Sequence, residues 1–147
     1  MNSTFIVREV AWHTHRVELQ AIRRAVFVEE QHVPEELEWD EADARCHHVL
    51  AFARGGEAIG TGRLLPDGHI GRMAVQAAWR SRGAGSAILK FLLTLAWRQQ
   101  FDVVQLHAQT HALGFYAKHG FAVMGDEFME AGIPHRAMML RLSPASR

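Results

Sequence analysis

The sequence has little cysteine, proline or tyrosine and no long apolar run. Its 147 residues include 1 cysteine, 4 prolines and 1 tyrosine. Cys46 alone cannot form an intrachain disulfide, which excludes a disulfide scaffold and fits a reducing compartment. The chain does not open like a signal peptide, and its longest apolar stretch, 84–96, is interrupted by polar residues and too short to span a bilayer. We therefore expect a cytoplasmic protein with no membrane partner.

An excess of charge of either sign is also absent. The 16 Lys and Arg residues balance 16 Asp and Glu residues, and 48% of the chain is hydrophobic. This balance, with no basic or aromatic stripe, argues against a nucleic-acid partner. The length and composition are typical of one globular domain over residues 1–147 that buries about two-thirds of its surface.

The order of secondary structure indicates a mixed α and β protein. Three strands separated by tight turns must pair as an antiparallel meander, and they cover 48–53, 58–65 and 69–75. Before them we expect a strand over 5–10, a helix from after His15 to near Gln31, and an acidic loop or broken helix over 33–44. After them we expect a helix over 83–100, a strand over 102–108, a helix over 112–119, and strands over 121–124 and 137–142. The strand over 102–108 should lie parallel to that over 69–75 through a right-handed crossover.

A glycine-containing loop between a strand end and a helix start is the most informative segment. The strand ends at Met73, Ala74 and Val75, and the loop and first helical turn contain Arg80, Ser81, Arg82, Gly83, Ala84, Gly85 and Ser86. Unpaired N–H groups and the positive end of the helix dipole favour phosphate there, and the two arginines would add charged donors. The alternative is that the glycines only help a helix begin close to a strand. The spacing fits neither a P-loop nor a dinucleotide-binding loop.

In this context the sequence resembles the Gcn5-related N-acetyltransferase (GNAT) superfamily. Arg80, Gly83 and Gly85 match its acetyl-CoA signature, Gln/Arg-x-x-Gly-x-Gly/Ala. Gln109, which stands where the superfamily usually has Asn, is followed by Ala112, Phe115–Tyr116 and Gly120–Phe121. Segments 26–31, 70–75, 108–109 and 132–135 resemble the ElaA-type branch, so that the likeness covers about residues 26–142.

The resemblance implies a GNAT fold, in the α/β (α+β) class. It implies a mixed sheet of six to seven strands with helices on both faces, in which the strands over 69–75 and 102–108 splay apart. Acetyl-CoA is then the co-substrate, and N–H groups of Met73 and Val75 would face its pantetheine and thioester. The residues expected to bind it are Met73, Ala74, Val75, Arg80, Ser81, Arg82, Gly83, Ala84, Gly85, Ser86, Gln109, Ala112 and Phe115.

The same resemblance implies that an amine attacks the thioester directly. Tyr116 would then donate a proton or hydrogen bond to the departing thiolate, the alternative being a ring packed under the sheet. His135, held by Pro134 before the last strand, is a candidate for substrate contact or proton relay rather than a structural role. Glu29 or Glu30, at the end of the first helix, would hold a cationic amine unless they are simply solvated.

Two further residues are candidates for acceptor binding. His107 alternates with glutamines on one face of its strand and would face the cleft. Arg72 would hold an anionic acceptor or pair with an acidic residue of the preceding loop. The acidic run over 35–41 is interpreted either as a solvated face or as weak support for a cationic substrate. The ten histidines show no zinc-site spacing, so we expect no metal.

Two functions from different classes remain open. The first is an acetyl-CoA-dependent N-acetyltransferase that modifies a primary amine of a small metabolite or protein. The second is a non-catalytic acyl-CoA sensor that contacts a partner protein. The presence of Tyr116 favours the enzyme, and the resemblance also raises the prospect of a homodimer.

Overall fold

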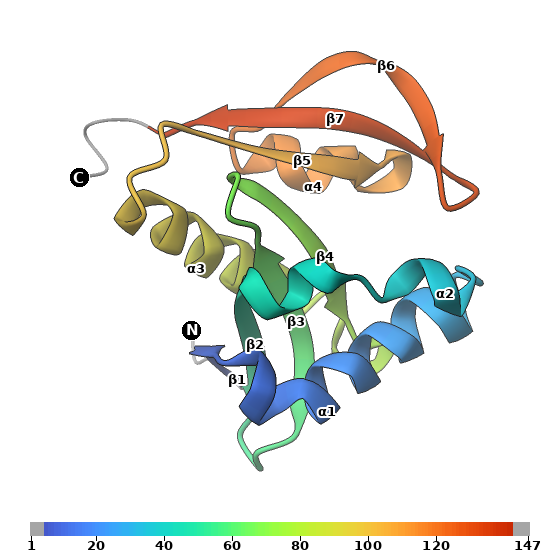
Figure 1. Ribbon diagram of the computed structural model, residues 1–147, viewed down its shortest axis with the longest axis vertical. Coiled ribbons are helices and arrows are strands. Elements are labelled where there is room, and N and C mark those ends of the chain that lie inside the picture. Colours follow the sequence, from blue (N-terminus) through green and yellow to red (C-terminus); the bar gives the residue numbers. More distant parts are fainter. Residues whose placement is uncertain (1–4, 143–147) are drawn as a thin grey trace.

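A seven-stranded mixed sheet organises the chain, as seen in a computed structural model that describes residues 5–142 (Figure 1). The strands are β1 (Phe5–Val10), β2 (His47–Ala53), β3 (Ala58–Leu64), β4 (His69–Val75), β5 (Val103–Gln109), β6 (Ala122–Glu130) and β7 (Ile133–Arg141). The α-helices are α1 (Trp12–Arg23), α2 (Glu35–Glu38), α3 (Ala84–Arg98) and α4 (Leu113–Lys118). A π-helix, η1 (Arg24–Glu30), continues α1, and short 3-10 turns are η2 (Glu41–Arg45), η3 (Ala77–Trp79) and η4 (Thr110–Ala112).

The sheet confirms the expected topology. Its order is β1-β2-β3-β4-β5-β7-β6, with β2, β3 and β4 forming the antiparallel meander that their short turns require. β4 and β5 are parallel, because α3 connects them as a crossover. The GNAT fold expected from the resemblance is therefore confirmed.

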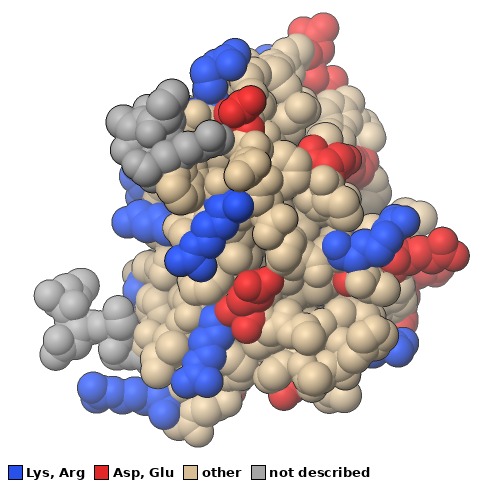
Figure 2. All heavy atoms as spheres, turned by 60° about the vertical axis from the view of Figure 1, so that its left-hand side comes forward, with Lys and Arg blue, Asp and Glu red and all other residues tan. Residues whose placement is uncertain are grey.

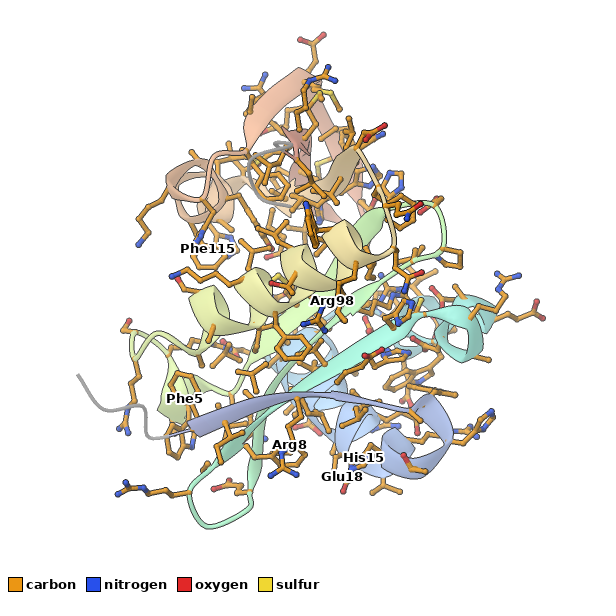
Figure 3. The ribbon with its side chains drawn as sticks, turned by 90° about the vertical axis from the view of Figure 1, so that its left-hand side faces the viewer. Phe5, Arg8, His15, Glu18, Arg98 and Phe115 are labelled. Carbon is orange, nitrogen blue, oxygen red and sulfur yellow. The ribbon has the colours of Figure 1, made fainter. Side chains whose placement is uncertain are left out.

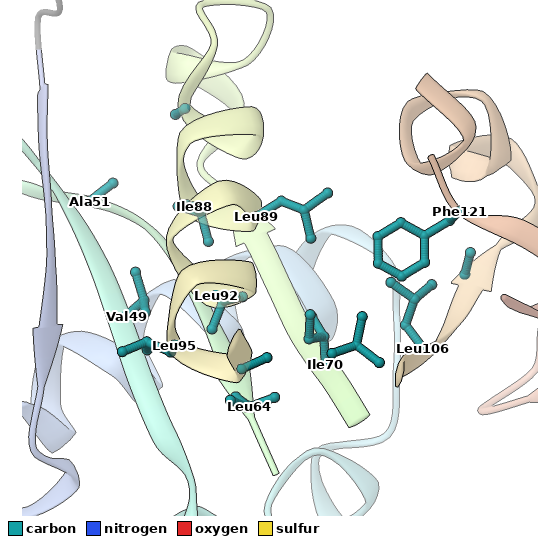
Figure 4. Close-up of a cluster of buried hydrophobic side chains, with 14 of the residues drawn as sticks. Val49, Ala51, Leu64, Ile70, Ile88, Leu89, Leu92, Leu95, Leu106 and Phe121 are labelled. Atoms are coloured by element: carbon teal, nitrogen blue, oxygen red, sulfur yellow. The ribbon is translucent and has the colours of Figure 1, made fainter. Parts of the chain in front are cut away.

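Helices cover the two faces of the sheet and create two cores. On one face, α3 packs Ile88, Leu92 and Leu95 against β2 and β3, while Leu89 faces Phe121 beyond β4 (Figure 4). On the other face, α1 and η1 bury a smaller set that joins the sheet: Leu19, Ile22, Val26, Leu50 and Ala74. Each of these two helical segments thus buries one apolar face against the sheet.

Element boundaries differ from the expectation at the first helix. α1 begins at Trp12, but His15 has non-helical dihedrals, φ −122° and ψ 20°, so that the regular apolar stripe starts only after it. From Arg24 the helix widens, and the Gln31 N–H donates to the Val26 carbonyl oxygen, five residues back, at 3.0 Å. The expected end near Gln31 is confirmed.

The last two strands are longer than expected. β6 and β7 form a hairpin closed by Ala131 and Gly132, both at positive φ. Pro134 lies near the start of β7, before the pairing with β5 begins, where a strand tolerates its missing N–H. A register shift between Met124 and Phe128 interrupts the alternation that would have revealed β6.

Charges of both signs are distributed over the face in Figure 2 without a block of one sign. Within residues 5–142, no helix is long and apolar enough to cross a membrane.

Candidate active site

A cleft forms where β4 and β5 separate. The two strands pair only at His69 with Gln105 and Ile70 with Leu106, and they diverge beyond those pairs (Figure 1). The pairing of β3 with β4 also shifts, so that two residues of β4, Arg72 and Met73, fall where β3 supplies one. Arg72 has φ 49°, as the irregular residue of such a bulge can. The splay expected from the resemblance is therefore present, and it opens a cleft of about 1070 Å³.

The cleft brings together most of the residues proposed from the sequence. Those that line it are Glu30, Arg72, Met73, Ala74, Val75, Arg80, His107, Gln109, Ala112, Tyr116 and His135. The remaining candidates lie outside this lining: Glu29, Ser81, Arg82, Gly83, Ala84, Gly85, Ser86 and Phe115. Most of the second group belong to the turn that starts α3, beside Arg80 in sequence.

The N-terminus of α3 fits a phosphate group. Gly83 precedes the helix at φ 90°, and a Cβ there would meet no atom within 4 Å. The first hydrogen bond of the helix runs from the Ala87 N–H to the Gly83 carbonyl oxygen, and no side chain caps this end within the described chain. The N–H groups of Ala84, Gly85 and Ser86 therefore have no partner inside the helix. A helix N-terminus with free N–H groups favours an anion.

Both arginines of this loop have partners within the protein. The Arg80 guanidinium forms a two-pronged ion pair with Glu30, including a 2.6 Å hydrogen bond from Nη2 to Oε1, and its Nε donates to the Val75 carbonyl oxygen at 3.0 Å. The hydrogen bond from the Arg80 guanidinium to the Glu30 carboxylate lowers the pKa of Glu30. Arg82 lies over the Trp79 ring at 5.0 Å. Arg80 thus joins η1 to the end of β4.

Packing fixes the elements around this loop. The Phe115 ring reaches from α4 to the start of α3, where its Cζ would lie 3.5 Å from a Cβ on Gly85 (Figure 3). The Ser86 hydroxyl is 3.0 Å from Nε2 of His119. On the β5 side, the Gln109 amide donates to the Gln31 side chain at 2.8 Å. The residue that replaces the family's usual Asn therefore links β5 to the end of η1.

Tyr116 points its hydroxyl at the bulge of β4. The hydroxyl donates to the Met73 sulfur at 3.7 Å, and the ring meets Phe115 and Phe121 edge-on. Burial raises the pKa of Tyr116 to about 12. A thioether is a weak acceptor, so the phenol keeps its proton and can donate it to a better acceptor in the cleft.

His135 is held in one orientation at the opposite side of the cleft. Its ring is buried, Nδ1 lies 2.7 Å from the Ile133 carbonyl oxygen, and Phe128 stacks on it at 6.0 Å. Because a carbonyl oxygen can only accept, Nδ1 carries a hydrogen and Nε2 is the basic atom of the neutral ring. Nε2 lies 3.9 Å from the Glu130 carboxylate, which also accepts from Nδ1 of His107 at 2.9 Å.

Sequence reasoning missed Glu130, Phe128 and His69, which pack around the two histidines. His69 meets His107 edge-on at 5.9 Å, and Phe128 meets His107 at 5.0 Å. The signal was available for Glu130: Ala131-Gly132 is a hairpin turn, and recognising it would have placed Glu130 beside the Gly-Ile-Pro-His element.

The acidic segment is only partly a solvated face: Glu35, Glu36 and Glu41 are exposed, whereas Glu38 is buried, as is Asp43 just beyond the run. Arg23 is buried, and it binds Glu38 and Asp43 at 2.8 Å each. Arg63 binds Asp40 at 2.8 Å and Asp43 at 2.7 Å. The hydrogen bond from Arg63 lowers the pKa of Asp40 to about 2, while burial raises the pKa of Glu38.

Arg72 completes this network. Its Nε lies 3.0 Å from the Glu38 carboxylate, so Arg72 pairs with an acidic residue of the preceding loop, as one of its two interpretations proposed. The segment 35–45 is thereby held against β3 and β4, where Leu37 and Glu38 form part of the cleft wall. The support for a polycationic substrate is weakened, because Glu38 and Asp40 of the acidic run are already paired with arginines of the protein.

Across residues 5–142, no group of three His, Cys, Asp or Glu side chains could hold a metal ion. The half-buried Cys46 has a pKa raised by burial to about 11, which does not favour a thiolate.

The splayed sheet, the uncapped helix and the cleft are the features expected of a GNAT domain, and the sequence comparison agrees. A family model described as an acetyltransferase (GNAT) domain matches residues 13–142. The chain belongs to the GNAT acetyltransferase family.

Particular relatives place it near the ElaA proteins. YyaT of Bacillus subtilis is 38% identical over 97% of both chains. ElaA of Escherichia coli is 31% identical over 82% of this chain and 83% of its own. The crystal structure of ElaA is 28% identical, with a TM-score of 0.80 over 92% of this chain and 98% of its own. An acyl-CoA N-acyltransferase from Pseudomonas aeruginosa is 30% identical, with a TM-score of 0.77 over 92% and 97%. The ElaA-type resemblance is confirmed.

Proposed function

We propose that this protein transfers the acetyl group of acetyl-CoA to a primary amine. One observation carries the proposal: a single cleft, opened by the splay of β4 and β5, is lined by both Tyr116 and His135 and includes Arg80, in the loop that leads to the uncapped start of α3. The helix start suits the phosphates of the coenzyme. The cleft suits its pantetheine arm, and the two side chains suit the two proton transfers of acyl transfer to an amine.

Each proton has a residue to carry it. The thioester supplies the acetyl group: a C–N bond forms to the neutral amine and the C–S bond breaks. One N–H proton of the amine is lost and one proton is gained by the sulfur, so the products are the acetamide and coenzyme A as its free thiol. Nε2 of His135 accepts a proton from the amine, because its Nδ1 is already committed to Ile133. The Tyr116 hydroxyl protonates the leaving sulfur, or donates a hydrogen bond to it, from the side of Met73.

The loop residues hold the coenzyme rather than react. Backbone N–H groups of Ala84, Gly85 and Ser86 would bind its phosphates, and Gly83 leaves them accessible because it adds no side chain. Arg80 shapes this loop through Glu30, since its guanidinium is engaged there.

Calorimetric titration with acetyl-CoA, coenzyme A and ATP tests the binding step. We expect acetyl-CoA and coenzyme A to bind and ATP to bind far more weakly. Gly83→Asp should abolish binding, because a carboxylate then faces the phosphates, whereas Gly55→Asp, in the turn between β2 and β3, should leave it unchanged. Equal binding of acetyl-CoA by both variants would show that the phosphates do not bind at the start of α3.

Release of free thiol during incubation with an amine panel tests the chemical step. Tyr116→Phe should keep acetyl-CoA affinity and lose about 100-fold or more in turnover, the usual scale of a general acid. Binding of acetyl-CoA without turnover on any amine would favour the sensor over the enzyme.

A further inference from the structure

Two hydrogen-bond acceptors face each other at the histidine side of the cleft. The first is Nε2 of His135, which is the acceptor of the neutral ring because Nδ1 donates to the Ile133 carbonyl oxygen. The second is Oε2 of Glu130, 3.9 Å away, while the other oxygen of that carboxylate accepts from His107. A separation of 3.9 Å is too long for a direct hydrogen bond, but one ammonium nitrogen could reach both atoms at about 2.8 Å.

The strand register places Glu130 and His135 on the same face of the sheet. His135 lies opposite Phe128 on one side and Gln109 on the other, and Glu130 follows Phe128 by two residues. Side chains two residues apart on a strand share a face, as do directly paired residues. Glu130, His135 and Gln109 therefore share the sheet face from which the cleft opens, on three neighbouring strands.

The other carboxylates that line the cleft are already paired. Glu30 binds Arg80, Glu38 binds Arg72, and Asp67 lies 3.1 Å from the His69 ring. Like Asp67, Glu130 pairs with a histidine ring, that of His107, but its second oxygen faces Nε2 of another histidine, the buried His135, at 3.9 Å. Among the described cleft residues, Glu130 is therefore the carboxylate best placed to bind an incoming amine.

The arginines of the cleft limit the substrate further. Arg63 is bound by Asp40 and Asp43, Arg72 by Glu38, and Arg80 by Glu30. An acceptor with a carboxylate or phosphate beside its amine would therefore meet no cleft arginine that lacks a carboxylate partner among the described residues. The segment from η1 to α2 contributes apolar groups to the cleft lining: Phe27, Val33 and Leu37.

We propose that Glu130 and His135 together bind the ammonium group of the acceptor, and that this acceptor is a primary amine on an uncharged, apolar arm. Glu130 neutralises the ammonium while His135 takes its proton, and His107 fixes the carboxylate from the far side. The inference rests on the proposed acetyl transfer and adds the substrate class and the residue that selects it.

The test uses 2-phenylethylamine and phenylalanine, which differ only by a carboxylate beside the amine. Each is titrated calorimetrically into the full-length protein saturated with coenzyme A. We expect 2-phenylethylamine to bind at least about tenfold more tightly than phenylalanine, and Glu130→Gln to weaken its binding by about tenfold, as loss of one charge-assisted hydrogen bond does. Glu127→Gln, on the same strand but outside the cleft lining, is the matched control and should leave binding unchanged.

Acetyl-CoA titration of the same samples separates the two proposals. If acetyl-CoA binds but Glu130→Gln holds 2-phenylethylamine as tightly as the unaltered protein, or phenylalanine binds equally well, the assignment of Glu130 is wrong while the proposed function stands. The same holds if neither amine binds. If acetyl-CoA itself does not bind, the acetyl-transfer proposal fails, and this inference fails with it.

Discussion

The single tyrosine allows the state of the proposed proton donor to be measured directly. Burial raises the pKa of Tyr116 to about 12, whereas an ordinary phenol titrates near 10. At pH 11 an ordinary tyrosine would be about 90% ionised, and Tyr116 should be only about 10% ionised. At neutral pH the phenol is therefore fully protonated, as a donor to a leaving thiolate must be.

Absorbance of tyrosinate between pH 8 and 13 gives this titration without interference from other tyrosines, since the chain has 1 tyrosine. Tyr116→Phe provides the blank, and circular dichroism at each pH shows whether the fold persists. Because the folded state holds this proton more tightly than the unfolded state, stability should fall as pH rises from about 10 to about 12. A midpoint near 10 while the protein remains folded would refute the burial of this hydroxyl and weaken its role as the acid.

Three further perturbations test the fold that supports the site. Arg23→Met removes the cation from buried carboxylates and should lower the free energy of unfolding by about 3 kcal/mol, or the melting temperature by about 10 °C. Arg24→Met, at a side chain that is 42% exposed, should lower the free energy of unfolding by about 1 kcal/mol or less. Equal losses in a thermal melt would contradict the buried network. Asp40→Asn should destabilise the protein at pH 6, and its difference from the unaltered chain in urea unfolding should vanish as pH falls from about 4 to about 2, because the pKa of Asp40 is lowered to about 2. Gly83→Ala should lower the free energy of unfolding by about 1 kcal/mol, because φ is 90° at this position. Gly114→Ala, in a helix with open space around it, should raise the free energy of unfolding by about 0.5 to 1 kcal/mol. Changes of the same sign in the two variants would refute the reasoning.

The parts of the fold that depend on local pattern could be predicted from the sequence. The three central strands follow from short turns, and α3 follows from an apolar stripe that is mostly buried. The resemblance then supplied the splay of β4 and β5, which no periodicity shows.

Features set by long-range contacts could not be predicted. Glu38, Asp40 and Asp43 could not be distinguished from their solvated neighbours, because nothing local shows that arginines from three separate elements converge on them: Arg23, Arg63 and Arg72. The hairpin that brings Glu130 to His135 was hidden by the register shift in β6 and by Pro134 in β7. In both cases the missing information was which distant side chains meet.

The π-helical end of α1 explains how the sheet stays open at the cleft. β4 and β5 lose their mutual hydrogen bonds beyond Ile70 and Leu106. Consecutive residues at the end of η1 supply side-chain links instead: Glu30 binds Arg80 beyond the end of β4, and Gln31 binds Gln109 at the end of β5. Because both links start from one helical turn, the two strands are held apart at a fixed spacing without direct pairing. The wall that should meet the acceptor and the loop that should meet the coenzyme are therefore braced by the same segment.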